Sequence, residues 1–408
     1  MEHIFHMHVL YFYQHFSTPA GSTGTRAYEM ARVLVSAGHQ VTVVCGSVDT
    51  ASTGVDGPVE RGIRRGTVDG IEVVEIVLPY SNYDGFIKRC FTFLRYAFRG
   101  IAIAATTKYD VLFATSTPLT AGIPGIAMRV LKPLRPFVFE VRDLWPELPK
   151  AMGVITNPLI LFAMDILERT SYLCASRCVG LAPGICEGIE KKTLGNKPVD
   201  LIPNGCDTDL FVPIEASQRR EGPLRAVYTG THGRANGLHA VLDAAQVLRQ
   251  RGEEDIELHF IGNGKQKPEL VERTKQDGLA NCFFHPSIPK SELAVLLPSY
   301  DVGMMVLDDV PAFYFGTSPN KFFDYISCGL PVLNNYPGWL AGMIGEHSCG
   351  HAVPPRDPEA FADALVALRE DPAGRLKMGK ASRELALVSF GRELLSSRFV
   401  ACLEAVVK

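Results

Sequence analysis

The chain has 408 residues, of which 47% are hydrophobic and 21% charged, and its formal net charge is −3. This composition excludes a largely disordered, collagen-like or coiled-coil protein, and the charge balance argues against a dedicated nucleic-acid binder. A single hydrophobic core stops growing at about 250–300 residues, so the length predicts two domains.

The ten cysteines are scattered and form no Cys-x-x-Cys pair, so neither a disulfide framework nor a structural zinc site is expected. Three histidines near the start, His3, His6 and His8, lack a carboxylate that would complete a ligand set, and we predict no metal. The first residues show no signal-peptide pattern, and no run approaches the ~20 apolar residues of a membrane span. These observations predict a cytoplasmic protein.

Segments typical of strands and helices alternate along both halves of the chain, which predicts parallel sheets covered by helices. The first half begins with a predicted strand over 3–13, a glycine-rich turn over 20–24, a helix over 25–39 and a second strand over 40–46. Four further strands are predicted at 70–80, 109–116, 136–143 and 177–183. The second half restarts the alternation with the following segments: 224–230, 238–252, 256–262, 268–278, 281–288, 290–301, 302–308, a helix from Pro319, and 330–335.

This pattern predicts two doubly wound α/β domains with a boundary near residues 198–211. A crevice between them, at the carboxyl ends of the strands, is where such folds bind ligands. We expect an N-terminal domain over 1–200, a C-terminal domain over 201–390, and a C-terminal helix over 391–408 that crosses back to the first domain.

The stretch from Phe315 to Val332 carries the clearest chemical pattern. Ser318 followed by Pro319 predicts an N-cap and a first helical residue. The amides of Asn320 and Lys321 would then lie at a positive helix end beside the lysine ammonium, which suits a diphosphate. Asp324, one turn later, could accept hydrogen bonds from two ribose hydroxyls. The alternative is a surface helix with an ordinary cap.

This segment resembles the nucleotide-sugar site of retaining glycosyltransferases of family 4, whose GT-B fold has two Rossmann-like domains facing across a cleft. Four other segments agree with that family's domain junction, its glycine-rich diphosphate loop, its "GxG" strand end and its base-reading strand: 203–207, 229–238, 260–264 and 283–288. The resemblance covers essentially the whole chain. It implies transfer of a sugar from a nucleotide diphosphate to an acceptor hydroxyl, with retained anomeric configuration and without a bound metal.

The chain departs from the family in its charged residues. The family's paired glutamates align with Gly316 and Asp324, and its loop arginine and lysine align with Thr231 and Asn236. Positive charge at the diphosphate is then expected from helix dipoles or from three other side chains: Arg234, Lys321 and Arg26. The predicted donor site also includes the following residues: Gly21, Gly24, His232, Gly233, Asn236, Ile288, Gly316, Thr317, Ser318, Asn320 and Asp324.

The acceptor side is predicted where the hydrophobic strand ending at Val141 meets a charged cluster. Asp143 or Glu147 could orient the acceptor hydroxyl, Arg142 could hold a phosphate, and Trp145 could stack on a sugar face. The alternative is a buried ion pair between Arg142 and either Glu140 or Glu147. Segments 142–147 and 320–325 together resemble the branch of the family that builds bacterial surface polysaccharides, including transferases of N-acetylfucosamine-type sugars.

A basic, amphipathic segment covers residues 86–101. Between residues 86 and 135 there are eight lysines and arginines and a single acid, Asp110. Such a helix can lie on an anionic bilayer, which suits a lipid-linked acceptor and predicts peripheral contact with the inner leaflet. The alternative is an ordinary helix whose basic side chains reach past the sheet that it covers.

The predicted reaction uses Lys321 and Arg234 to stabilise charge on the leaving diphosphate and Asp143 to align the acceptor hydroxyl. Uridine diphosphate is the expected carrier, and no cofactor is required. The glycine turn at 20–24 does not fit Gly-x-Gly-x-x-Gly, which disfavours a nicotinamide cofactor. Two other functions stay open: a nucleotide-sugar 2-epimerase on the same architecture, and a non-catalytic protein that binds nucleotide sugars.

Overall fold

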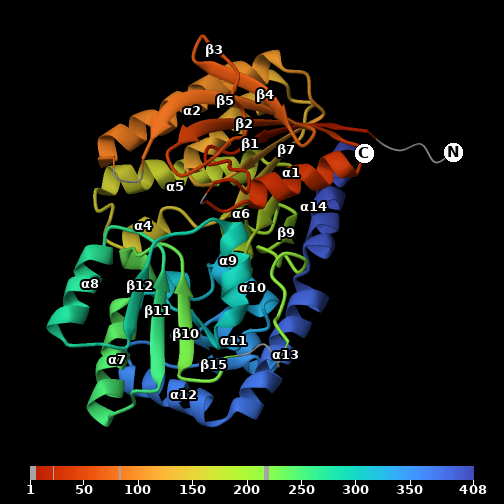
Figure 1. Ribbon diagram of the computed structural model, residues 1–408. Helices are drawn as coiled ribbons and strands as arrows, with labels where there is room; N and C mark the ends of the chain where they lie inside the picture. The colour runs from red at the N-terminus through yellow and green to blue at the C-terminus, as the bar shows by residue number, and fades with distance from the viewer. Residues whose placement is uncertain (1–5, 22, 82–83, 216–219) are drawn as a thin grey trace. The chain divides into compact units, whose positions relative to one another are not determined.

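The computed structural model describes residues 6–21, 23–81, 84–215 and 220–408, so His3 lies outside it. The chain divides into two compact units (Figure 1). We call the first the N-terminal unit, which comprises Met1–Pro203, Gly316–Ser318 and Leu395–Lys408. The second, the C-terminal unit, comprises Asn204–Phe315 and Pro319–Leu394.

The N-terminal unit is built on a mostly parallel sheet. In the described part of the chain it has nine strands in the order β3-β4-β5-β2-β1-β6-β7-β8-β9. Only the β3–β4 and β4–β5 pairs at one edge are antiparallel. The strand bounds are β1 His8–Phe12, β2 Gln40–Val48, β3 Val59–Glu60, β4 Ile63–Val68, β5 Ile71–Tyr80, β6 Val111–Thr115, β7 Phe137–Val141, β8 Arg177–Gly180 and β9 Val199–Leu201.

Every residue of β6 and β7 is buried, as expected for central strands covered on both faces. The covering helices are α1 Arg26–Ser36, α2 Phe86–Thr106, α3 Ile123–Leu131 with the preceding 3₁₀ turn η1 Leu119–Gly122, α4 Glu147–Ala151, α5 Pro158–Cys174 and α6 Pro183–Thr193. The start of α5 follows directly from its sequence. The Asn157 side chain accepts hydrogen bonds from the amides of Leu159 and Ile160, and Pro158 occupies the first turn.

The C-terminal unit has a second parallel sheet, with six strands among the described residues in the order β12-β11-β10-β13-β14-β15. Figure 1 shows β10, β11 and β12 side by side. The strand bounds are β10 Leu224–Thr229, β11 Ile256–Ile261, β12 Cys282–His285, β13 Val302–Met305, β14 Val332–Asn334 and β15 Gly350–Ala352.

Helices α7 and α12 close one side of this core: the apolar faces of both helices are buried with β10 and β11. The helices of the unit are α7 His239–Arg251, α8 Lys267–Gln276, α9 Lys290–Leu296, α10 Asn320–Ser327, α11 Trp339–Glu346, α12 Pro358–Glu370 and α13 Pro372–Ser389, with 3₁₀ turns η3 Arg234–Asn236, η4 Leu297–Ser299 and η5 Pro311–Phe313. Both sheets follow the doubly wound plan that the alternation predicts.

The last helix, α14 Arg392–Val407, belongs to the N-terminal unit from Leu395 onward. The Phe399 ring meets the Phe113 ring of β6 edge-on, with centroids 5.0 Å apart, and Glu404 lies 3.3 Å from the imidazole of His39. Among all helices in the described ranges, none is both long enough and apolar enough to cross a bilayer.

One predicted helix start is wrong by a residue. Helix α10 begins at Asn320, and its N-cap is Pro319, whose extended backbone (φ −77°, ψ 127°) stands outside the helix. The side chain of Ser318 therefore lies one position too early to cap α10, and no side-chain cap bond forms.

Candidate functional site

In the C-terminal unit, two loops that follow neighbouring strands cross tightly after β10 and β11. A Cβ atom on Gly262 would lie 1.9 Å from the carbonyl oxygen of Gly230, and one on Gly264 would lie 2.3 Å from that of His232. The His232 amide donates to the carbonyl of Asn263 at 2.9 Å. Only glycine permits this approach, and the crossing fixes the position of His232.

The imidazole of His232 is buried, and neither ring nitrogen has a hydrogen-bond partner among the described residues. Burial, helped by the charges of Lys267 and Lys321, lowers the His232 pKa to about 4. The ring is therefore neutral at physiological pH, with one donor and one acceptor available. Three aromatic rings surround it at centroid distances of 5.9, 6.5 and 6.0 Å: Tyr228, Phe260 and Phe284.

Lys321, in the first turn of α10, points toward the same loop. Its Nζ donates to Tyr228 Oη at 3.0 Å and to Asn236 Oδ1 at 3.1 Å, and it lies 4.3 Å from the centre of the Tyr228 ring. Burial lowers the Lys321 pKa to about 7. No carboxylate pairs with this ammonium in the described structure, so no acidic side chain competes with a bound anion for it.

The loop that carries Asn236 packs against residues 307–308, which follow β13. A Cβ on Gly237 (φ +56°) would lie 2.6 Å from the amide nitrogen of Asp308, so this tight contact requires glycine. Arg234 opens the short 3₁₀ turn after Gly233, and its side chain is exposed. Asn236 and Lys321 thus lie in contact, whereas Arg234 has no ion pair in the described ranges.

Asp324 lies three residues after Lys321 in α10 and is half-buried. Burial raises the Asp324 pKa to about 6; Lys290 and Arg392 oppose this shift, and Asp207 adds to it. Asp207 itself forms ion pairs with Lys290 and with Arg392. Asp324 therefore borders a charge cluster, and no spacing in the sequence indicates the two basic members of that cluster.

The other predicted donor residues occupy loops or helix ends. Ile288 is half-buried between β12 and α9, and Asn320 is exposed at the start of α10. The half-buried residues Gly316, Thr317 and Ser318 are grouped with the N-terminal unit rather than with α10.

In the N-terminal unit, three adjacent parallel strands, β1, β6 and β7, deliver polar residues to one edge of the sheet. The Arg142 amide, just after β7, donates to Ser116 Oγ at 2.9 Å, just after β6. Thr117 Oγ1 donates to Asp143 Oδ2 at 3.3 Å. This second set of polar groups at the carboxyl ends of strands is the arrangement in which α/β sheets bind ligands.

Arg142 brings a positive charge to this edge, and its guanidinium carbon lies 5.3 Å from the centre of the Tyr13 ring. Burial first, and then the charges of Arg142 and Arg89, lower the His15 pKa to about 4. Burial also raises the pKa of Asp143, although Arg142 and Thr117 favour its charged form. Tyr13, Ser116 and Thr117 carry no recognisable motif, so the sequence does not identify them.

The ion pair considered for Arg142 does not form in the described structure, because both carboxylates have other partners. Glu147 lies 3.0 Å from Lys192. Glu140 is buried and binds Arg26 at 2.8 Å and Thr115 at 2.8 Å.

Arg26 is buried as well, and it is fully engaged inside the N-terminal unit. Besides Glu140, its guanidinium donates to the carbonyls of Pro203 at 2.7 Å and Ile202 at 2.8 Å. Because these bonds occupy its guanidinium inside the N-terminal unit, we do not include Arg26 in the donor site. The glycine turn is tight at Gly21, where a Cβ would lie 2.2 Å from Ser17 Oγ, and Gly24 is exposed.

In the described ranges, no group of three or more His, Cys, Asp or Glu side chains has the arrangement of a metal site.

Comparison with protein families gives the same division of the chain. Residues 21–205 match the family model described as "Glycosyl transferase 4-like domain", and residues 223–371 match the one described as "Glycosyl transferases group 1".

The chain is similar to several curated proteins. It is 30% identical over 207 residues to the D-inositol 3-phosphate glycosyltransferase of Paenarthrobacter aurescens (47% of this chain, 48% of the relative) and 29% identical over 188 residues to the D-rhamnosyltransferase WbpZ of Pseudomonas aeruginosa (44% and 46%). A D-inositol 3-phosphate glycosyltransferase from Corynebacterium urealyticum is 27% identical over 343 residues (76% of each chain). The chain thus spans about half the length of the first relatives that it matches.

Among solved structures, sucrose-phosphate synthase from Thermosynechococcus elongatus superposes with a TM-score of 0.75 at 18% identity, covering 98% of both chains. WaaG, a glycosyltransferase involved in lipopolysaccharide biosynthesis, gives 0.68 at 15% (97% and 98%), and HepE of Anabaena in complex with UDP and glucose gives 0.68 at 14% (98% and 100%). The two parallel-sheet units are those of the GT-B fold.

Proposed function

We propose that this chain, which joins a glycosyl transferase 4-like domain to a group 1 glycosyl transferase domain, is a retaining glycosyltransferase that uses a nucleotide-diphosphate sugar. The observation that carries the proposal is the ammonium of Lys321. It is half-buried and unpaired with any described carboxylate, and it lies beside Asn236 and the neutral His232 at the start of α10. A diphosphate is the anion that a helix start and a glycine-rich loop suit best.

In the proposed reaction, the bond between the sugar C1 and the β-phosphate oxygen breaks. A bond from C1 to the acceptor oxygen forms on the same face, and the acceptor proton passes to the departing phosphate oxygen. Lys321 and Arg234 stabilise the charge that grows on the diphosphate, and Asp143 aligns the acceptor hydroxyl. Asp324 accepts hydrogen bonds from the ribose. Because side chains supply the positive charge, the reaction needs no metal cofactor, and we expect full activity in EDTA.

Uridine diphosphate is our choice of carrier. It is supported by the fold shared with HepE, which was solved in complex with UDP and glucose. The acceptor that we propose is a lipid-linked or oligosaccharide hydroxyl in the building of a bacterial surface polysaccharide. The resemblance to N-acetylfucosamine-type transferases and the fold shared with WaaG, which takes part in lipopolysaccharide biosynthesis, support this choice.

Helix α2 supports the lipid-linked acceptor, because it leaves an apolar stripe uncovered. Ile87, Phe91 and Phe98 are 71%, 64% and 65% exposed, and with Leu94 their spacing of four, three and four residues places them on one face. The opposite face is buried on the sheet, where Tyr96 donates to the carbonyl of Val44 at 2.7 Å. A stripe of this kind suits the surface of a bilayer.

Two features extend this apolar face and make it attractive to anionic lipid. Lys88 and Arg95 are exposed along the same helix. Helix α3 packs against both α2 and α5, and α5 also exposes large apolar side chains. On α5 these are Leu159, Ile160, Phe162, Ile166 and Leu173.

The test begins with a panel of nucleotide sugars screened for thermal stabilisation, since a ligand at a hundred times its Kd adds about 2.7 kcal/mol. With the best binder, Lys321→Ala should lower kcat by about 100-fold or more while weakening donor binding less than tenfold, because the ammonium acts on charge that develops during transfer. Lys275→Ala, at an exposed lysine of α8 in the same unit, is the matched control. Equal losses in kcat and binding would contradict the proposed role of Lys321.

The same assays separate the two other functions. An epimerase would convert the nucleotide sugar into an epimer when no acceptor is present. A non-catalytic binding protein would be stabilised by the nucleotide sugar and would show no transfer with wild-type protein.

A further inference from the structure

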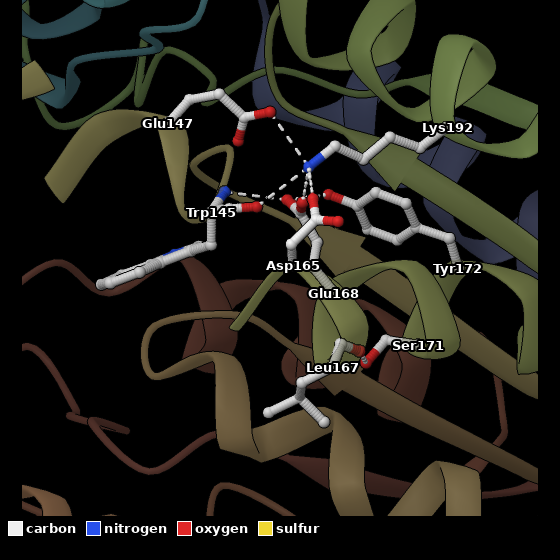
Figure 2. Close-up of polar contacts among 8 residues, drawn as sticks. All are labelled: Trp145, Glu147, Asp165, Leu167, Glu168, Ser171, Tyr172 and Lys192. Atoms are coloured by element: carbon white, nitrogen blue, oxygen red, sulfur yellow. Dashed lines mark hydrogen bonds and ion pairs between the residues drawn. The ribbon is translucent and has the colours of Figure 1, made fainter. Parts of the chain in front are cut away.

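The backbone of Trp145 is held on both sides by charged side chains. Its amide donates to Glu168 Oε1 at 2.8 Å, and its carbonyl accepts from Lys192 Nζ at 3.1 Å. Lys192 also pairs directly with Glu168 Oε2, and Tyr172 Oη donates at 2.5 Å to Glu168 Oε1, the oxygen that accepts from the Trp145 amide. Figure 2 shows these contacts converging on the lysine nitrogen from α4, α5 and the loop between β7 and α4.

The ion pair between Lys192 and Glu168 lies largely out of contact with solvent. The Glu168 side chain is fully buried, and that of Lys192 is 17% exposed. Glu147 and Asp165 approach the same ammonium from the outside, at 3.0 and 3.1 Å, and each is about half exposed. A buried ion pair seldom stabilises a fold more than apolar side chains of the same volume, because desolvation offsets the attraction. An apolar pair could not supply the hydrogen bond from Tyr172 or the two hydrogen bonds to Trp145, and only the latter two hold the loop after β7.

The Trp145 side chain points away from the cluster (Figure 2). Its indole Nε1 is buried and has no hydrogen-bond partner among the described residues. A buried donor left without an acceptor costs about 1–3 kcal/mol. Trp145 lies two residues after Asp143 and three after Arg142, the predicted acceptor residues at the end of β7.

We infer that Lys192 and Glu168 are positioning residues for the acceptor: they clamp the Trp145 backbone so that the indole presents its face and its Nε1–H to an acceptor sugar. A hydroxyl or ring oxygen of that sugar accepts the hydrogen bond that Nε1 lacks. The inference rests on the proposed function, because it takes the 142–147 segment as the acceptor side. It adds two residues, from α5 and α6, that have no recognised motif.

The central variant is the double substitution Lys192→Met with Glu168→Leu, which replaces the ion pair by apolar side chains of similar volume and leaves no buried charge unpaired. Lys191→Met, at the exposed neighbouring lysine, is the matched control. Lys192→Arg keeps the charge and the donors. Transfer is measured with hexyl β-D-glucopyranoside as the acceptor probe and the nucleotide sugar that stabilises the wild type most.

We expect the double variant to unfold cooperatively and to keep its donor KM within about twofold. Its KM for the glucoside should rise at least tenfold, whereas Lys192→Arg should stay within about threefold of wild type and Lys191→Met should be unchanged. If Lys192 and Glu168 only stabilised the fold, the double variant would have a lower thermal midpoint, and its KM for the glucoside would change no more than its donor KM. A cooperatively folded double variant with a wild-type glucoside KM would overturn the inference.

A second readout needs no activity. In a Trp339→Phe background, Trp145 is the remaining tryptophan of the chain. We expect acrylamide to quench Trp145 fluorescence at least twice as strongly in the double variant as in the parent. If wild-type protein transfers no sugar, the proposed function fails on that result, and unchanged quenching in the double variant would separately refute the clamp.

Discussion

Lys321 is the residue whose protonation should control donor binding. Its pKa is about 7 in the free protein because the ammonium is desolvated, and a bound diphosphate would raise it. Binding therefore takes up a proton above pH 7, and donor affinity should fall by up to about tenfold in total as the pH rises from 7 to 9. Calorimetric titration with the best nucleotide sugar at pH 6, 7, 8 and 9 measures this.

Lys321→Gln is the control for that titration, and it should bind the donor less than about tenfold more weakly than wild type at pH 7, with little dependence on pH. His232 cannot produce the effect, because its pKa of about 4 keeps it neutral throughout the window. A wild-type affinity that is flat from pH 6 to pH 9 would contradict the assignment of the ammonium to the diphosphate.

Asp324 should cost the free protein stability at neutral pH. Its pKa is raised to about 6, so folding favours the protonated carboxyl, and this stability is present below the unfolded pKa near 4 and lost as the pH rises through 6. Asp324→Asn should therefore raise the unfolding free energy by about 1–2 kcal/mol at pH 7.5 and change it little at pH 4. Urea denaturation at the two pH values tests this, and equal shifts at both would count against a buried carboxylate.

At this scale the sequence identifies residues that lie in a motif and misses those that arrive from elsewhere. Lys321 and Asn236 could be proposed as site residues because one lies at a helix start and the other in a glycine-rich loop. Lys321 Nζ lies 3.1 Å from Asn236 Oδ1. Lys290 and Arg392 reach Asp207 from 83 and 185 residues away, a proximity that no local pattern encodes. The burial of Arg26 could not be predicted from the sequence either, because its partner Glu140 lies 114 residues further along the chain.

Helix α2 is the element with the most direct test. Replacing Ile87, Phe91 and Phe98 by Ser should lower the partition coefficient onto vesicles containing 30% phosphatidylglycerol at least tenfold, because each buried apolar side chain contributes about 1.5–3 kcal/mol. Vesicle co-sedimentation measures the coefficient. Kcat with a soluble acceptor should not change.

The matched control for α2 removes exposed apolar side chains from the C-terminal unit, at Val295 (81% exposed) and Val388 (69%). If Val295→Ser with Val388→Ser weakened vesicle binding as much as the α2 variant, the site on α2 would be wrong. Reversing Lys88 and Arg95 to Glu should weaken binding to anionic vesicles and leave binding to neutral vesicles unchanged.

Elements with a strong period could be predicted from the sequence, and short polar ones could not. The buried parallel strands β6 and β7 are visible as apolar runs, and the basic amphipathic helix is visible in its composition. The antiparallel edge formed by β3 and β4 is not, because β3 has two residues and the half-exposed β4 has little apolar alternation. The exposure of the apolar side chains of α5 could not be predicted from the sequence, because an apolar helix is normally expected to be buried.

On the scale of the molecule, α14 links the stability of the N-terminal unit to the end of the described chain. Phe399→Ala should destabilise that unit by about 3–5 kcal/mol, since Phe399 is fully buried against Phe113. The two tryptophans report separately, because Trp145 lies in the N-terminal unit and Trp339 in the C-terminal unit. We expect the Trp145 transition to shift to lower urea in a Trp339→Phe background.

The complementary background, Trp145→Phe, follows Trp339 and should show an unchanged transition. An exposed substitution on the same helix, such as Arg398→Ala, serves as the control for α14. Equal shifts of both transitions by Phe399→Ala would show that the helix supports both units alike and would contradict this prediction.

The return of residues 395–408 to the N-terminal unit has a consequence for biosynthesis. The C-terminal unit is completed by residue 394, whereas the first-made unit still lacks Leu395, Phe399 and Leu403, which are all fully buried. A nascent chain that has exposed only residues 1–394 outside the exit tunnel leaves the place of Phe399 in the N-terminal unit unfilled. Nascent-chain proteolysis should therefore find the later-translated half protected first.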